Sequence, residues 1–270
     1  MKHKNNSTAI PNYQLKSGCL MPVLGMGTWK LTGKPCEKAV RWGLELGYTH
    51  IDTSDDYMNE EWIGKAIWGL DRSRLFITSK VDDSKLHRND LIQSCKETLE
   101  KLGTKYVDLY LIHRLNPTVP IEESMEAMEE LVKRSRVRSV GISNFNIAGI
   151  QRAIKATQVP VCNNQIKIHP YHYPSNIVEY CKKNGIVVTA YSPLDTGEIV
   201  DDDLLTQIGK KYRRSAPQVS LRWLLENGLI VIPKASSKNH LIENRNIFNW
   251  NLSDEDSAKL TQSSRESWRG

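Results

Sequence analysis

Long apolar runs are missing from this sequence. Its longest stretches without a polar residue are only a few residues long, whereas a membrane-spanning helix needs about 20 apolar residues. The first 14 residues are basic and contain no apolar segment, so they do not resemble a secretory signal. We therefore expect no membrane contact and a cytoplasmic location.

Cysteine is also scarce. The chain has five cysteines, an odd number, and no two of them are separated by just two residues. This spacing predicts neither a disulfide framework nor a zinc site, and it fits a reducing cytosol. The neighbouring Asp55 and Asp56 could bind a cation, but we favour a solvated loop for them. We expect no metal site.

The charge of the chain is basic but mostly interleaved. A net charge of +6 and a pI of about 9.0 favour anionic partners such as nucleic acid, a membrane surface or a phosphorylated ligand. The one dense basic run, residues 133–138, follows an acidic stretch over residues 122–130. We interpret that run as a solvated surface and expect no nucleic acid partner.

Short apolar, β-branched runs alternate with longer amphipathic stretches along the chain, which predicts βα units and a parallel sheet. Strands are expected to end near Trp29 and to cover residues 49–52, 75–80, 107–113, 137–143, 161–165, 186–191 and 229–232. Helices are expected over residues 35–46, 60–68, 88–102, 121–134, 175–184, 203–212, 217–227 and 238–247. A further helix is expected after the fifth strand, ending at residue 150.

Eight strands with eight crossovers predict an α/β fold, a (β/α)8 TIM barrel, with a flat doubly wound sheet as the competitor. A length of 270 residues suits one such domain over residues 1–270. Ahead of the barrel, residues 13–15 and 20–22 flank a Lys-Ser-Gly turn, which predicts a small β-hairpin. Trp42, Trp62, Trp68 and Trp223 occupy helical positions and are expected to pack.

Polar or aromatic side chains stand at the end of nearly every predicted strand. In (β/α)8 barrels, functional groups project from these carboxyl ends. The residues at these positions are Asp52, Lys80, His113, Ser143 with Asn144, Gln165, Tyr191 and, after the eighth strand, Lys234. We expect them to meet in one pocket.

These residues predict an acid that serves a carbonyl group. Lys80 would hold its charge beside Asp52, and the paired ammonium would lower the pKa of a nearby phenol, for which Tyr57 is the candidate. Such a tyrosine can donate a proton to a carbonyl oxygen, which His113 could orient. No side chain donates hydride, so reduction of the carbonyl would require a nicotinamide or a flavin.

The chain resembles the aldo-keto reductase superfamily, in particular its small microbial members. The resemblance rests on the segments GYTHIDT (47–53), YMNE (57–60), ITSK (77–80), DLYLIH (108–113), GISNF (141–145), NQ (164–165), AYSPL (190–194), LRW (221–223), IPK (232–234) and EN (243–244). They stand in the family's order and span nearly the whole chain.

The resemblance implies a catalytic tetrad of Asp52, Tyr57, Lys80 and His113, with Tyr57 as the general acid of an NADPH-dependent carbonyl reductase. It also implies a long cofactor site. The residues implied there are Gly27, Thr28, Trp29 and Asp52, then Ser143, Asn144 and Gln165 at the nicotinamide carboxamide, Tyr191 stacked on the ring, Ser192 and Leu194 along the pyrophosphate, and Lys234, Ser236, His240, Glu243 and Asn244 at the adenosine end.

Two departures from the family pattern bear on ligands. Arg114 stands where the family often has tryptophan, so the substrate residues become Trp29, Tyr57, His113 and Arg114. A guanidinium there would favour substrates with a carboxylate or phosphate; the alternative is that it points to solvent. His240 replaces an arginine that often binds the 2′-phosphate, so NADPH is preferred through Lys234, with NADH as an alternative.

Short loops after His113 and Tyr191, and little chain after the last helix, predict an open site. The expected partner is a small carbonyl substrate, and the expected state is a monomer. Two other functions stay open. One is a cofactor-binding, weakly active redox sensor or scaffold subunit. The other is an aldolase with Lys80 as a Schiff base, although a lysine paired with Asp52 is a poor nucleophile.

Overall fold

The computed structural model describes residues 9–267 of the chain. Most of the basic N-terminal stretch falls in residues 1–8, so its interpretation lies outside the described residues. Within the described range, no helix combines the length and the apolar character that crossing a membrane requires.

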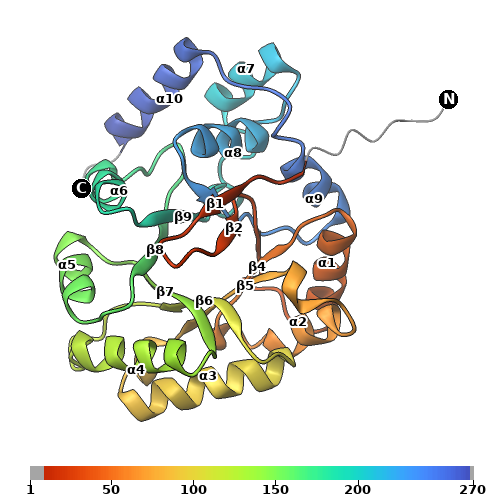
Figure 1. Cartoon of the computed structure of the whole chain (residues 1–270). Helices are drawn as coiled ribbons and strands as arrows, with labels where there is room; N and C mark the ends of the chain where they lie inside the picture. The colour runs from red at the N-terminus through yellow and green to blue at the C-terminus, as the bar shows by residue number, and fades with distance from the viewer. Residues whose placement is uncertain (1–8, 268–270) are drawn as a thin grey trace.

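Eight parallel strands follow one another around a closed sheet in chain order, from β3 to β10 (Figure 1). They are β3 (Met26–Gly27), β4 (His50–Asp52), β5 (Phe76–Val81), β6 (Val107–Ile112), β7 (Val137–Ser143), β8 (Val161–Lys167), β9 (Val187–Tyr191) and β10 (Ile230–Val231). Bridges from Leu24 to Val231 and from Gly27 to Lys234 join the first strand to the last. The predicted (β/α)8 barrel is confirmed, and the flat sheet is excluded.

Helices surround the strands (Figure 1). They are α1 (Gly33–Glu45), α2 (Glu60–Ile67), α3 (Arg88–Leu102), α4 (Ile121–Lys133), α5 (Ile147–Lys155), α6 (Ser175–Lys183), α7 (Asp203–Tyr212), α8 (Ala216–Glu226), α9 (Lys238–Arg245) and α10 (Asp254–Ser267). Short 3-10 turns lie at η1 (Asp55–Tyr57), η2 (Arg72–Arg74), η3 (Asp83–Lys85) and η4 (Asp195–Gly197). The helices bury their apolar faces against the outside of the barrel, where the larger core cluster lies.

Closure of the barrel depends on a glycine. The Gly27 amide donates to the Pro233 carbonyl at 3.2 Å. A Cβ atom at residue 27 would stand only 2.6 Å from the carbonyl oxygen of Ile232. The first and last strands can approach this closely because glycine has no side chain.

The predicted hairpin is present and covers the amino ends of the strands. Strands β1 (Asn12–Gln14) and β2 (Leu20–Pro22) pair antiparallel, and the Ser17 and Ser139 hydroxyls meet at 2.7 Å. Apolar hairpin and strand residues form a second buried cluster there: Leu15, Met21, Phe76, Leu109, Leu111, Cys162, Val187 and Ile230. We call this the plugged end of the barrel. The opposite, carboxyl end of the strands is left for polar groups.

Several predicted boundaries differ from the structure. The first strand ends at Gly27 rather than near Trp29, and α5 continues to Lys155. Helix α1 begins at Gly33, so Pro35 lies in the first helical turn, where a missing N–H is tolerated. Trp68 was expected to pack but is 85% exposed, because α2 ends one residue earlier. Trp42, Trp62 and Trp223 do pack against the core, as expected.

Helix α10 was missed by sequence reasoning, which expected little after the last helix. Its sequence is mostly polar, so it lacks the apolar periodicity that marks a helix. Leu260 is nevertheless fully buried, and Asp256 accepts hydrogen bonds from Lys211 (2.6 Å) and Tyr212 (2.7 Å) at the end of α7. Polar contacts and one apolar anchor therefore dock this helix.

Candidate active site

The residues expected at the strand ends do lie at the carboxyl end of the barrel. Asp52 ends β4, Lys80 lies near the end of β5, and His113 directly follows β6. Ser143 ends β7 and Tyr191 ends β9, with Gln165 inside β8. The parallel order of the strands explains why these residues, distant in sequence, share one edge of the sheet.

Lys80 and Asp52 form a buried ion pair. The Lys80 Nζ atom donates to Asp52 Oδ1 at 2.6 Å and to the Thr53 carbonyl at 2.8 Å. The lysine is 0% exposed and the aspartate 2%. Burial alone lowers the pKa of Lys80, but Asp52 and Tyr57 outweigh it, so the pKa is raised and the group stays an ammonium. A charged, buried amine cannot form a Schiff base, which argues against the aldolase alternative.

Tyr57 stands over this pair. Its hydroxyl lies 3.5 Å from Lys80 Nζ, and the ammonium also lies 4.9 Å from the centre of its ring. Lys80 lowers the pKa of this phenol, as expected, but the net pKa is not depressed as we expected. Burial raises the pKa of Tyr57 above its usual value of 10.0 and outweighs the opposing effect of Lys80. The phenol therefore keeps its proton at neutral pH.

Hydrogen bonds link the strand ends both around and across the barrel. Gln165 Nε2 donates to the second carboxylate oxygen of Asp52 at 2.6 Å, and Ser143 Oγ donates to the Gln165 carbonyl at 2.8 Å. Asn144 Nδ2 donates to the His113 carbonyl at 3.0 Å and its Oδ1 accepts from the Tyr191 hydroxyl at 2.9 Å. The groups assigned to the nicotinamide edge thus orient one another.

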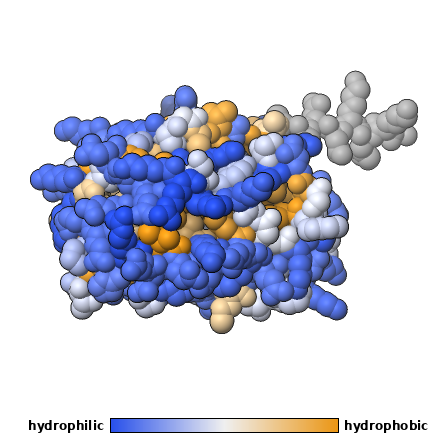
Figure 2. All heavy atoms as spheres, turned by 60° about the horizontal axis from the view of Figure 1, so that its bottom comes forward, coloured by the Kyte–Doolittle hydropathy of each residue, from blue (hydrophilic) through white to orange (hydrophobic). Residues whose placement is uncertain are grey.

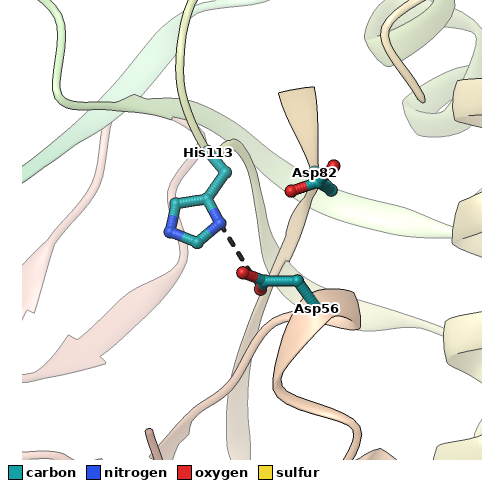
Figure 3. Close-up of side chains that lie close together, drawn as sticks. All are labelled: Asp56, Asp82 and His113. Carbon is teal, nitrogen blue, oxygen red and sulfur yellow. Dashed lines mark ion pairs between the residues drawn. The ribbon is translucent and has the colours of Figure 1, made fainter. Parts of the chain in front are cut away.

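His113 is buried beside Tyr57, with the two rings edge to face and their centres 6.0 Å apart. Its Nδ1 atom lies 3.3 Å from Ser54 Oγ and 3.5 Å from Asp56 Oδ1, and Asp82 stands nearby (Figure 3). In the described part of the chain, Asp56, Asp82 and His113 are the group of three metal-ligand types whose donor atoms lie within 4.8 Å of one another. The absence of a metal stays a prediction.

Asp55 corrects the expectation of a solvated acidic loop. Its carboxylate is buried and accepts from the Asp82 amide (3.1 Å), Lys85 Nζ (2.9 Å) and Ser94 Oγ (2.8 Å). Asp56, next to it, is the exposed member of the pair, with 37% of its side chain accessible. The two neighbours face opposite ways because they lie in the tight turn η1.

Sequence reasoning gave no role to Asn59, which fixes the loop that follows the first strand. Its Nδ2 donates to the carbonyls of Thr28 and Leu31, both at 2.9 Å, and its Oδ1 accepts from Thr53 Oγ1 at 2.6 Å. Thr28 also donates through Oγ1 to the Asp52 carbonyl at 2.9 Å. Only the family motif YMNE pointed to this residue, because a lone asparagine carries no signal of its own.

The rim of the site offers charged groups that have no partner within the described residues. Lys234 and Arg114 are both exposed, and neither side chain makes an ion pair or hydrogen bond with a side chain or backbone group of residues 9–264. Ser236 and His240 are exposed near the start of α9, while Glu243 is half-buried and Asn244 is buried. Exposed cations without a partner suit a phosphorylated ligand.

Two strand ends carry strained backbone. Asn144 and Ser192 have φ angles of +63° and +47°, in the left-handed region that residues with side chains seldom adopt. Such outliers cluster where ligands bind. Ser192 and Leu194 are half-buried beside Tyr191, so the hydrogen-bonding edge, the aromatic ring and the free cations fit an extended dinucleotide such as NADP(H).

Trp29 and Met58 are large apolar side chains that stay accessible. Trp29 is 44% exposed, with Lys30 Nζ lying 4.3 Å from its ring centre. Met58 follows Tyr57 and is 82% exposed. Arg114 follows His113 and acts electrostatically on Tyr191. Two apolar side chains and the Arg114 guanidinium are therefore exposed next to residues of the site.

The fold is a (β/α)8 barrel, and the polar groups at its strand ends suit an oxidoreductase of that fold. The family model of the aldo/keto reductase family matches residues 23–265, and the chain belongs to that family. It is 36% identical over 250 residues to the glyoxal reductase of Bacillus subtilis, with 92% of this chain and 90% of the relative covered.

Solved structures of aldo-keto reductases are also similar to this chain. The Bombyx mori aldo-keto reductase AKR2E4 in complex with NADP is 32% identical, with a TM-score of 0.88, covering 95% of this chain and 93% of the other. The aldo-keto reductase MGS-M4 from a Medee basin deep-sea metagenome library is 30% identical, with a TM-score of 0.90 and coverage of 93% and 95%.

Proposed function

We propose that this enzyme reduces aldehydes and ketones to alcohols with NADPH, and that Tyr57 is its general acid. The observation that carries the proposal is the contact of the Tyr57 hydroxyl with the buried Lys80–Asp52 pair. The nicotinamide would supply hydride to the carbonyl carbon. Tyr57 would donate its proton to the carbonyl oxygen, and the fixed ammonium of Lys80 would stabilise the phenolate that remains.

His113 would bind the same carbonyl oxygen through its second ring nitrogen and set its position relative to Tyr57. Ser143, Asn144 and Gln165 would hold the carboxamide of the cofactor, with Tyr191 against the ring. Gly27, Thr28 and Trp29 would line its near side, and Ser192 with Leu194 its pyrophosphate. Lys234 would face the 2′-phosphate, with Ser236, His240, Glu243 and Asn244 around the adenosine, which favours NADPH over NADH.

For the substrate we propose a small carbonyl compound that carries a carboxylate or phosphate. Arg114 supports this, because its guanidinium is exposed beside Tyr191 and has no partner among the described residues. The first relative above is named for glyoxal, itself a small carbonyl compound. Trp29, Tyr57 and His113 would form the rest of the pocket.

The oligomeric state, location and partners of the enzyme are also part of the proposal. We propose one domain over residues 1–270, a monomer in the cytoplasm, and no nucleic acid partner. The face drawn in Figure 2 supports a monomer, since hydrophilic side chains cover most of it and interrupt its apolar areas.

The test is the absorbance of NADPH mixed with the protein and either a carboxylated aromatic aldehyde or its neutral analogue. We expect oxidation with both, faster with the anion. Arg114→Ala should remove that preference, and Arg74→Ala, an exposed arginine near the plugged end, should keep it. Equal losses on both aldehydes would contradict the role of Arg114. Tight NADPH binding without oxidation of any aldehyde would favour the redox sensor or scaffold.

A further inference from the structure

Asp56 contacts the histidine of the site but has no part in the reaction described so far. Its Oδ1 atom lies 3.5 Å from His113 Nδ1, and Ser54 Oγ lies 3.3 Å from the same nitrogen. Figure 3 shows the carboxylate pointing at this side of the ring, with the second ring nitrogen on the opposite side. The Nδ1 edge of the imidazole is therefore occupied by a carboxylate and a hydroxyl.

The charge of Asp56 decides where the histidine carries hydrogen. Burial alone raises the pKa of Asp56, but the hydrogen bonds of His113 and Ser54 lower it to about 2. At neutral pH the group is a carboxylate, which accepts hydrogen bonds and donates none. A carboxylate this close favours the tautomer that carries its hydrogen on Nδ1, since it cannot donate one to that atom.

This placement restricts what the other nitrogen can do. A neutral imidazole has one N–H, so with that hydrogen on Nδ1 the Nε2 atom is an acceptor. A carbonyl oxygen needs a donor. His113 can therefore bind the carbonyl of a substrate only when both nitrogens are protonated, and Asp56 balances the resulting positive charge.

We propose that Asp56 is a positioning residue that keeps the hydrogen on His113 Nδ1, so that His113 serves carbonyl reduction as the imidazolium. The inference rests on the proposed function. In the reverse direction the neutral ring would be the competent form, because its free Nε2 can accept from the hydroxyl of an alcohol. Reduction and oxidation would then have different pH ranges.

Other charged groups face His113 from the elements around it. Asp82, at the start of η3, contributes a second negative charge, but its Oδ1 accepts from the Ser84 amide (3.0 Å) and hydroxyl (2.6 Å). Tyr57 lies against the ring from η1, and Lys80 lies behind Tyr57 on β5. Asp56 alone among them forms an ion pair with the ring in the described residues. Asp82→Asn is therefore the matched control.

The first test is the pH profile of kcat/KM for reduction. Asp56→Asn keeps an acceptor oxygen but removes the charge, so the alkaline limb should move to lower pH by about one unit, the usual size of such a charge effect. The rate would fall roughly tenfold on that limb and change little at pH 6. Asp82→Asn should move the limb by less than half as much. Equal shifts in both variants would overturn the proposal, because they would reflect the general field.

The second test needs no turnover. Nitrogen-15 NMR of the histidine rings, with His113→Gln to assign the signal, should show hydrogen on Nδ1 of neutral His113 at pH 9. Asp56→Ala, checked for folding by circular dichroism, should lose this preference, and Asp56→Asn serves if the alanine variant is unfolded. Hydrogen on Nε2 in the unmodified protein would overturn the inference. The expected spectrum without any NADPH oxidation would contradict the proposed function instead.

Discussion

The two ends of the barrel are built from the same strands and differ in almost everything else. Strand β5 starts with Phe76 in the apolar cluster of the plugged end and reaches Lys80 at the other end. Strand β6 likewise runs from Leu109 and Leu111 to the edge where His113 follows. The plugged end holds an apolar cluster, with the buried His50 packed on Phe76, whereas the carboxyl end buries the Lys80–Asp52 ion pair beside His113.

The difference shows that one end of the barrel mainly stabilises the fold, while the other end holds the groups proposed to react. Apolar burial under the hairpin stabilises the barrel without directional contacts. At the carboxyl end, Lys80 and Asp52 are desolvated, and only their mutual contact and added hydrogen bonds compensate that cost. Substitutions at the two ends should therefore separate activity from stability.

Lys80→Met should have the largest effect, and it should affect both properties. It leaves Asp52 buried without its partner, which costs about 3–5 kcal/mol of unfolding free energy. Carbonyl reduction should fall below detection. Urea unfolding and NADPH oxidation measure the two effects. Lys65→Met, which removes an exposed lysine paired with Glu61 within one helix, should change neither. Retained activity would contradict the role of Lys80.

Met21→Ala tests the plugged end alone. Met21 is fully buried under the hairpin, so its truncation should cost about 2–5 kcal/mol. The kcat of the folded fraction should stay unchanged, because within residues 9–264 no hydrogen bond or ring contact joins this cluster to Tyr57. Leu20→Ala, on the exposed side of the same strand, is the control and should leave the unfolding midpoint in place. A large fall in kcat for Met21→Ala would show that the two ends are coupled.

Gly27→Ala should have a smaller effect, on both stability and cofactor binding. The added methyl group would stand 2.6 Å from the Ile232 carbonyl, and backbone on both sides must shift, at a cost of about 1–3 kcal/mol. Because Gly27 also borders the proposed cofactor site, the KM for NADPH should rise. Thermal unfolding and NADPH titration measure these changes. An unchanged melting temperature would mean that the closure tolerates a side chain.

The fold could be predicted from the sequence because its signals repeat. Eight apolar runs alternate with amphipathic helices, so an error of two residues at Trp29 does not change the barrel. Helix α10 was not predicted because it is mostly polar and docks through Asp256. Trp68 was misplaced because a helical pattern does not show where the helix ends.

The residues of the site could be predicted from the sequence. Their burial, charge contacts and pKa shifts could not. Asp52, Tyr57, Lys80 and His113 stand at strand ends that the topology brings together. The burial of Asp55, the contact of Asp56 with His113 and the raised pKa of Tyr57 depend on which way side chains face within one tight turn. Spacing along the chain does not encode that orientation.

The most direct test of the account is Tyr57→Phe, measured for NADPH binding and NADPH oxidation on the same sample. Loss of the hydroxyl leaves the ion pair and the barrel intact, so binding, followed by protein fluorescence, should be unchanged. Carbonyl reduction should fall by about 100- to 10,000-fold, the usual contribution of a general acid. Oxidation at the unmodified rate would contradict the assignment of Tyr57 as the proton donor.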